Sequence, residues 1–311
     1  MYAQFFMLFA MIFTGFFLKR IKIIKEDFMP GLNKLVLSFT FPCMVLYNTG
    51  TLNIDKALIG DVGIAFVIML LLFVVYSLVA KLYIRIRKFP KHQHCVLETA
   101  MVSPNNGFMG FPIALMFFGQ MGTLFMAVHN IIYNLYLFSY GTMIIEGTEK
   151  TENFKTHLKV LLKACVNPIV ICVVIGGFIG FFSVPLDNIV GDYIKLMGSM
   201  ATPLAMISIG ATLAKHNILD MFKDHMVWES SVMKNLAMPI ITLALMYFLP
   251  INPDIKSIAV LASAMPMGAT TAIIVTENNK DAKLAGNILF FTTLLAMATM
   301  PMMIWILESI A

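Results

Sequence analysis

Charged residues are scarce in this chain of 311 residues. Lys and Arg number 22 and Asp and Glu 17, so 13% of the residues are charged and 59% are hydrophobic, with a mean hydropathy of +0.84. Soluble domains average about 25% charged and about 45–50% apolar residues. The composition therefore excludes an ordinary soluble protein and predicts an integral membrane protein that has the lipid bilayer as its surroundings.

Enzyme and metal motifs are missing as well. Four cysteines, Cys43, Cys95, Cys165 and Cys172, have no metal-binding or redox spacing, which is typical of small packing residues. There is no phosphate-binding glycine loop, nucleophile elbow or pair of catalytic carboxylates. We expect no enzyme activity, cofactor, metal ion or nucleic-acid partner.

Long apolar segments dominate what is present. About 20 apolar residues are needed to cross the hydrocarbon core. Ten segments approach this length: 3–18, 31–49, 58–83, 94–118, 122–145, 160–182, 194–213, 229–249, 255–276 and 284–307. The predicted fold is all-α with ten transmembrane helices, and the first segment is expected to be a span and not a cleaved signal.

The basic residues predict the orientation of these spans. With ten spans, 19 of the 22 Lys and Arg residues fall on one side, and only Lys56, Lys195 and Lys256 fall on the other. Because cytoplasmic loops are enriched in basic residues, the first side is assigned to the cytoplasm. We expect a multi-pass protein of the cytoplasmic membrane with both termini outside. This count also leaves no basic side chain in the middle of a span.

One segment combines helix breakers with amides inside a predicted span. It runs Ser103-Pro104-Asn105-Asn106-Gly107-Phe108-Met109-Gly110-Phe111-Pro112. Prolines and glycines interrupt the helical hydrogen bonds. Such a break is tolerated in a membrane only where it is buried in protein or lines a wet cavity, and transporters hold their substrates at breaks of this kind.

A similar break recurs in the second half of the chain. Pro42 precedes Pro203 by 161 positions, and Pro104 precedes Pro266 by 162 positions. The matched offsets predict two repeats, 1–147 and 160–311, joined by a cytoplasmic linker at 148–159. Since five spans is an odd number, the repeats would be inverted, and Pro104 and Pro266 would face each other at a crossover of spans 4 and 9. The alternative is that the two prolines only kink their helices.

The stretch 105–112 resembles the Asn-Thr-Gly-Phe-x-Gly-x-Pro signature of the auxin efflux carrier family of membrane transporters. Weaker likenesses cover the rest of the chain, at 32–42, 201–213 and 266–271. The resemblance implies ten spans in two inverted repeats, with a scaffold of spans 1, 2, 6 and 7 and a transport domain of spans 3–5 and 8–10. It also implies elevator-type transport of organic anions, and a homodimer formed through the scaffold. Asn106 departs from the family's usual Thr, and the linker is shorter than that of the plant auxin carriers.

The substrate site is expected at the predicted crossover. Amide, hydroxyl and exposed backbone groups suit a carboxylate in a low-dielectric cavity. The candidates are Ser103, Asn105, Asn106, Gly107, Gly268, Thr270 and Thr271. The alternative is that the amides only satisfy backbone groups freed by the break.

Two titratable residues inside spans are candidates for proton coupling. Glu98 lies about two turns before Pro104, and His129 lies in the fifth span beside Asn130 and Asn134. Glu98 would instead be interfacial if span 4 begins later, and His129 would serve interhelical hydrogen bonding. The coupling ion, H⁺ or Na⁺, stays open at this stage.

These features predict a secondary transporter of a small organic anion of the carboxylate class. No ATP-binding motif is present, so a gradient or a partner subunit must supply the energy. The alternatives are a ligand sensor with a transporter fold, or a carrier of a neutral or zwitterionic molecule such as an amino acid.

Overall fold

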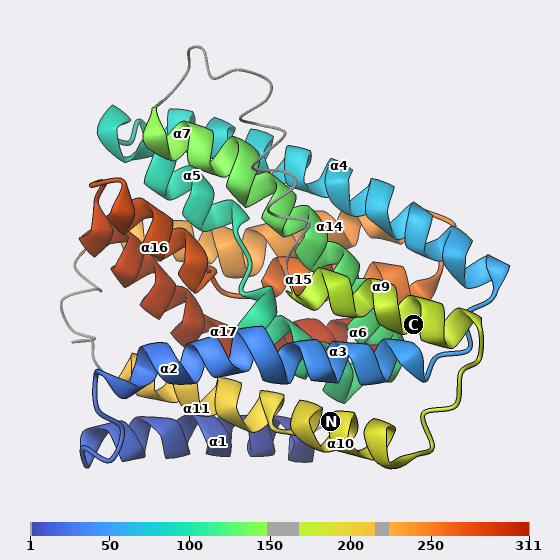
Figure 1. The fold of residues 1–311 in the computed structure, drawn as a ribbon. Coiled ribbons are helices and arrows are strands. Elements are labelled where there is room, and N and C mark those ends of the chain that lie inside the picture. Colours follow the sequence, from blue (N-terminus) through green and yellow to red (C-terminus); the bar gives the residue numbers. More distant parts are fainter. Residues whose placement is uncertain (1, 148–167, 215–223, 311) are drawn as a thin grey trace. The chain divides into compact units, whose positions relative to one another are not determined.

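The computed structural model describes residues 2–147, 168–214 and 224–310, and in these ranges regular structure is entirely helical apart from one isolated bridge (Figure 1). The predicted linker 148–159 and the start of the sixth expected span lie outside the described residues. The chain divides into two compact units. Unit 1 comprises Met1–Gly63, Gly107–Val128 and Val166–His216, and unit 2 comprises Ile64–Asn106, His129–Cys165 and Asn217–Ala311.

Unit 1 contains helices from both halves of the sequence. They are α1 (Tyr2–Arg20), α2 (Phe28–Leu35), η1 (Val36–Thr40), α3 (Phe41–Gly50), α9 (Pro168–Phe181), α10 (Ile189–Ser199) and α11 (Ala201–Leu213). Within the unit α1 packs on α11, and α3 packs on α9 and α10.

Unit 2 is built mainly from the middle and the end of the chain. Its helices are η2 (Lys91–Gln93), α5 (His94–Val102), η4 (Leu137–Gly141), α7 (Thr142–Glu146), α13 (His225–Val232), η5 (Met233–Ala237), α14 (Met238–Tyr247), α15 (Pro253–Ala264), α16 (Ala269–Glu277) and α17 (Ala282–Ile310). Three further elements contribute residues to both units: α4 (Lys56–Arg87), η3 (Asn106–Gly110) and α6 (Phe111–Tyr136).

Close contacts at glycine hold the helices of unit 1 together. A Cβ added to Gly15 would lie 2.1 Å from the carbonyl oxygen of Ile207, and one added to Gly210 would lie 1.8 Å from that of Ile12. The backbones of α1 and α11, which run side by side in Figure 1, therefore touch at both glycines. Gly180 of α9 approaches the carbonyl of Leu52 in the same way. In lipid, apolar burial drives little association between helices, so they depend on close van der Waals packing. Small residues such as glycine permit this close approach.

Three π-helical turns have a common cause in the sequence. The turns η1, η3 and η5 are each followed by a helix whose second residue is proline, namely Pro42, Pro112 and Pro239. A proline ring clashes with the carbonyl four residues earlier, and a widened turn relieves this clash. The fourth π turn, η4, has no such proline.

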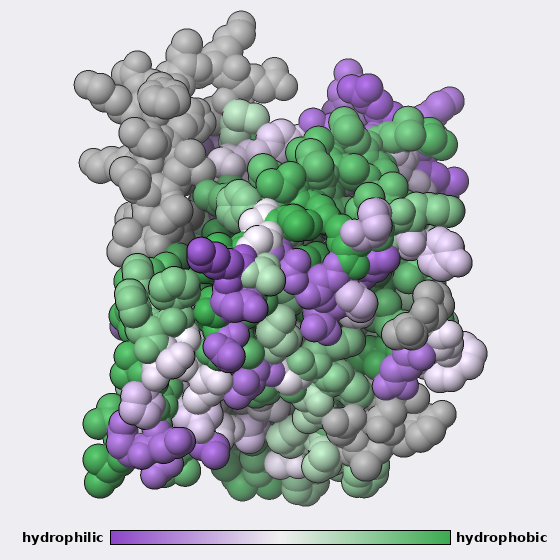
Figure 2. Space-filling model, turned by 90° about the vertical axis from the view of Figure 1, so that its right-hand side faces the viewer, coloured by the Kyte–Doolittle hydropathy of each residue, from purple (hydrophilic) through white to green (hydrophobic). Residues whose placement is uncertain are grey.

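Apolar side chains cover much of the outside of the helices, as the hydropathy colouring of one face shows (Figure 2). On α4 the residues Leu70, Leu71, Val74 and Leu78 are exposed, while Phe73 is buried. Within the described residues five helical segments are long and apolar enough to cross a membrane: Phe28–Gly50, Lys56–Arg87, Asn106–Glu146, Ile189–Leu213 and Ala282–Ser309. This confirms an all-helical fold compatible with a membrane protein. The count of ten spans and the inverted repeats stay predictions.

The breaks expected at two prolines are present. Helix α5 ends at Val102, two residues before Pro104, and α15 ends at Ala264, two residues before Pro266. A further interruption lies inside α6 at Gly119, whose φ of 59° and ψ of −145° are accessible to glycine. It separates the segments 94–118 and 122–145 that the sequence predicts as two spans.

Candidate functional site: the paired break of unit 2

The segments Ser103–Asn106 and Met265–Gly268, here called the paired break, lie against each other in unit 2. The Asn105 amide donates to the carbonyl of Pro266 at 2.8 Å, and the Gly268 amide donates to the carbonyl of Ser103 at 3.2 Å. Pro104 thereby stands opposite Met267 in an isolated antiparallel bridge. Each break satisfies backbone groups that the other leaves open, as burial away from water requires.

Gly268 is essential to this approach. A Cβ at this position would lie 2.7 Å from the hydroxyl of Tyr133 and 2.9 Å from the carbonyl of Pro104. Gly268 also precedes α16 as its N-cap residue. The positive end of the α16 dipole therefore points at the paired break.

The amide of Asn106 contacts the buried ring of His129. Asn106 Nδ2 lies 3.0 Å from His129 Nδ1, within hydrogen-bond distance of the ring nitrogen. Within the described residues three buried atoms here have no hydrogen-bond partner: Ser103 Oγ, Asn106 Oδ1 and His129 Nε2. Unpaired buried polar atoms are costly, so this cluster is suited to a polar ligand or to water.

A lysine joins the ends of the two broken helices. Lys234 in η5 is 1% exposed, and its ammonium donates to the carbonyls of Ser263 at 3.3 Å and Val102 at 3.5 Å. These carbonyls lie at the C-terminal ends of α15 and α5, where helix dipoles favour a cation. Within the described residues no carboxylate pairs with Lys234, and the third donor of its ammonium has no acceptor.

Asn235 fixes the other side of η5. Its amide donates to the carbonyls of Thr292 at 3.2 Å and Ala264 at 3.5 Å, while its Oδ1 is buried without a partner in the described part of the chain. The hydroxyl of Thr292 in turn accepts the amide of Met267 at 3.1 Å. The π turn thus anchors the second segment of the paired break to α17.

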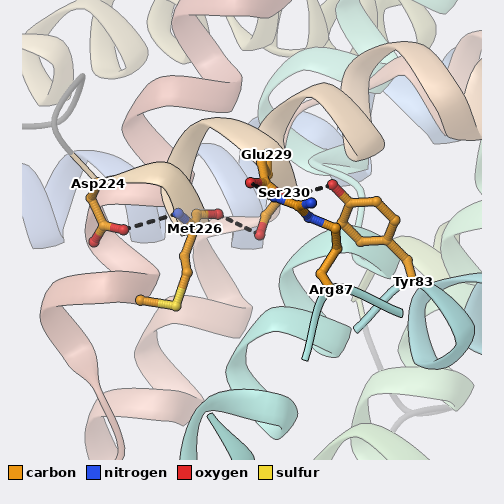
Figure 3. Close-up of polar contacts among 6 residues, drawn as sticks. All are labelled: Tyr83, Arg87, Asp224, Met226, Glu229 and Ser230. Atoms are coloured by element: carbon orange, nitrogen blue, oxygen red, sulfur yellow. Dashed lines mark hydrogen bonds and ion pairs between the residues drawn. The ribbon is translucent and has the colours of Figure 1, made fainter. Parts of the chain in front are cut away.

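An ion pair fixes the helix that precedes η5 (Figure 3). Glu229 of α13 accepts two bonds from Arg87 of α4, at 2.6 Å from Nε and 2.5 Å from Nη2, and one from the hydroxyl of Tyr83 at 2.9 Å. The side chain of Asp224 caps α13 by accepting the amide of Met226. Because η5 continues α13, these contacts help to position Lys234.

Glu98 lies on α5 and is 5% exposed. Its carboxylate accepts the hydroxyl of Tyr140 at 2.6 Å and lies 3.9 Å from the ammonium of Lys81. The same carboxylate lines a cavity of unit 2. Glu98 therefore borders a hollow on a different set of residues from those of the paired break.

The structure brings most of the predicted substrate residues together. Ser103, Asn105, Asn106 and Gly268 belong to the paired break, and Thr271 is buried with its hydroxyl 3.3 Å from that of Tyr133. The two remaining candidates do not join this cluster. Thr270 is exposed, and Gly107 belongs to unit 1, where a Cβ would meet Leu37.

The assignment of Lys234 to the cytoplasmic loops was wrong, because the structure buries it within η5. Its position near the start of the eighth expected span, 229–249, assigned it to the cytoplasmic loops. The ammonium is instead buried between two broken helices. The sequence did contain a signal for this site. Lys234 and Asn235 lie five and four residues before Pro239, which is where a proline is expected to widen the helical turn.

The arrangement provides hydrogen-bond donors, acceptors and one buried lysine, which suit binding. Within the described ranges no group of three His, Cys, Asp or Glu side chains gathers in a way that would hold a metal ion.

Comparison with known proteins gives a consistent assignment. The profile of the family described as "Membrane transport protein" matches residues 1–304. An uncharacterized transporter of Methanothermobacter thermautotrophicus is 24% identical over 298 residues, which cover 94% of each chain. An uncharacterized transporter of Methanocaldococcus jannaschii is 23% identical over 96% of both chains. An uncharacterized transporter of Escherichia coli is 22% identical over 94% of this chain and 93% of the relative.

Proposed function

We propose, from the premise that this chain belongs to the membrane transport protein family of the auxin efflux carriers, that it carries a small organic anion of the carboxylate class. The family match confirms the resemblance predicted from the residues 105–112. Membership makes the chain a membrane transporter, and the substrate class is inferred from the paired break.

The observation that carries the proposal is the buried charge of Lys234. Its ammonium is offset only by carbonyl dipoles, since no carboxylate of the described chain pairs with it. In a low-dielectric interior an unbalanced positive charge attracts an anion strongly. One lysine ammonium suits a monoanion, and an ionisable residue inside a membrane protein is by default a functional candidate.

Hydrogen-bond donors near this charge would orient the carboxylate. The amides of Asn105 and Asn106 offer side-chain donors, and α16 begins at the paired break with its open backbone N–H groups. Ser103 and Thr271 would add hydroxyl groups at the same place.

We further propose an elevator-type motion in which unit 2 moves as one body relative to unit 1. Two features support this mechanism. The chain forms two compact units, and the paired break with its supporting residues belongs to unit 2. The substrate would travel with the body that binds it, as alternating access requires.

Proton coupling through Glu98 is part of the proposal, with His129 as the second candidate. Glu98→Gln keeps the size of the side chain and removes its titration. If Glu98 carries the coupled proton, this variant loses the pH dependence of uptake, measured in proteoliposomes between pH 5 and pH 8. A persistent pH dependence would exclude Glu98, and His129→Gln then tests the second candidate. Uptake with and without a sodium gradient distinguishes H⁺ from Na⁺.

A second candidate substrate is a zwitterion such as an amino acid. Buried Oδ1 atoms of Asn106 and Asn235 have no donor within the described chain, and an ammonium group would supply one. The zwitterion would place its carboxylate near Lys234 and its ammonium near these amides.

A thermal-stability screen of the purified protein tests the substrate class, because a ligand of the folded state raises stability by mass action. Small monocarboxylates, dicarboxylates and amino acids are compared at equal ionic strength. We expect monocarboxylates to stabilise the protein and Asn105→Ala to abolish the effect without loss of folded protein. Unchanged binding by Asn105→Ala would reject the site. Binding without flux in proteoliposomes would instead identify a sensor.

The orientation and the assembly are also proposals. Both termini are placed outside the cytoplasmic membrane. A cysteine at Lys256 should therefore react with an impermeant maleimide on intact cells, and one at Lys283 should not; the reverse result would invert the topology. A homodimer through the scaffold spans predicts twice the chain mass in light scattering of the purified protein, and a monomeric mass would reject it.

A further inference from the structure

A cavity of about 620 Å³ opens in unit 2, apart from the paired break. Its size falls within the range of about 300–1,000 Å³ that is usual for small-molecule sites. Its lining comes from the end of α4, the turn before α5, α5 itself, the η4–α7 segment and Lys280, two residues before α17. These residues are Lys81, Ile84, Arg85, Lys91, His92, His94, Cys95, Glu98, Tyr140, Met143, Ile144, Gly147 and Lys280.

Most of the charged side chains that line this cavity, here called the basic cavity, are positive. Arg85, Lys91 and Lys280 line it, and none of the three pairs with a carboxylate in the described part of the chain. The single carboxylate of the lining, Glu98, is already bound by Tyr140 and lies 3.9 Å from Lys81. The remaining cations are therefore available to an anion.

The turn that presents two of the basic residues is well supported. Lys88 adopts a φ of 54°, which ends α4, and Phe89 is buried against the edge of the Tyr83 ring. His94 Nε2 bonds the carbonyl of Phe89 at 2.7 Å. These contacts hold Lys91 and His92 at the cavity independently of any ligand.

We propose that the basic cavity binds a phosphate monoester group, either that of a small soluble molecule or the phosphomonoester headgroup of phosphatidic acid. A phosphate monoester carries about two negative charges at neutral pH and three strong acceptor oxygens. Three cations that converge from different elements match such a dianion better than a monocarboxylate, and the guanidinium of Arg85 forms paired bonds to phosphate. The site is distinct from the proposed substrate site, because it shares no residue with the paired break.

A bound phosphate would also act on Glu98. Both the phosphate and the Glu98 carboxylate attract the ammonium of Lys81, so binding would weaken the existing Lys81–Glu98 contact. Since Glu98 belongs to the helix that ends at the paired break, occupancy of the basic cavity would regulate the transporter.

Binding of glycerol 3-phosphate to the full-length protein in a neutral detergent tests the soluble form of the ligand by calorimetry. Nanodiscs that contain phosphatidic acid, compared with phosphatidylcholine alone, test the lipid form by thermal shift. We expect Arg85→Gln, Lys91→Gln and Lys280→Gln each to weaken binding about tenfold, the effect of losing one charge-assisted hydrogen bond. Sodium acetate at equal ionic strength should not compete.

Lys283→Gln is the matched control, because Lys283 is exposed, lies three residues from Lys280 and does not line the cavity. It removes the same charge and should leave binding unchanged. Equal weakening by Lys283→Gln and Lys280→Gln would mean a diffuse charge effect and overturn the proposal. Absence of binding by both probes to the unchanged protein would also overturn it. Neither result bears on substrate binding at the paired break, which the carboxylate screen measures separately.

Discussion

The two units hold their helices together by different chemistry. In unit 1 the helices touch at glycines, so that the Cβ positions of Gly15, Gly180 and Gly210 are occupied by backbone carbonyls of neighbouring segments. Unit 2 is held by buried polar contacts. All but four of the buried polar side chains whose placement is described lie in unit 2, and the exceptions are Thr40, Thr49, Thr123 and Ser208. Close apolar contact suits a static support, whereas a polar interior suits a site that binds and releases a ligand.

Among tests of this contrast between the units, removal of the Lys234 ammonium from unit 2 should have the largest effect on binding and uptake. Lys234→Met keeps the length of the side chain but leaves the carbonyls of Val102 and Ser263 without their donor. We expect loss of carboxylate binding and uptake, because the positive charge at the paired break is gone. Binding is measured by thermal shift and uptake in proteoliposomes.

Lys283→Met is the control for this substitution, since it removes an exposed lysine of the same unit. It should bind and transport like the unchanged protein. Normal uptake by folded Lys234→Met would contradict the role assigned to the buried charge.

In unit 1 a methyl group added at a glycine contact should reduce stability more than one added at a glycine that faces open space. Gly180→Ala places a Cβ 2.6 Å from the carbonyl of Leu52, whereas Gly177→Ala on the same helix meets nothing within 4 Å. We expect Gly180→Ala to cost about 1–3 kcal/mol of stability, as overpacking does. Thermal unfolding in detergent measures the difference, and equal midpoints for the two variants would remove the case for glycine packing.

The hydrogen bond between Asn106 and His129 should give a smaller effect. A double-mutant cycle with Asn106→Ala and His129→Ala isolates their interaction from the other consequences of each change. We expect a coupling of about 1 kcal/mol, the usual net value for one neutral hydrogen bond. A coupling near zero would show that the 3.0 Å contact contributes nothing to unit 2.

The smallest effect should come from the ion pair between α4 and α13. The side chain of Arg87 is 48% exposed, so water and salt screen its attraction to Glu229. Arg87→Gln should lower the unfolding midpoint slightly at low salt, and the difference should vanish at high salt. A large loss at every salt concentration would instead mean that this contact is essential for positioning η5.

The membrane class, the family and the breaks at Pro104 and Pro266 could be predicted from composition, the residues 105–112 and proline spacing. Adjacent residues were harder to separate. Thr271 is buried and Thr270 is exposed, because one residue turns a helix by about 100° and only one of two neighbours then faces inward. Lys234 was missed because counting basic residues by their position along the chain ignores how helices pack around them.

The widened turns give this chain a dependence on residue number as well as on residue type. A π turn contains about one residue more than an α-helical turn closed over the same path, and η5 holds Lys234 and Asn235 within such a turn. Loss of one residue there would restore regular winding with the flanking turns kept in phase, and the side chains inside the turn would change direction by up to about 100°. The ammonium would then turn away from the two helix ends it joins, although every side chain of the site was still present. The orientation of the Lys234 side chain therefore depends on the number of residues in the helix. The uncharged Pro239, which follows the π turn, is the residue that favours this widened turn.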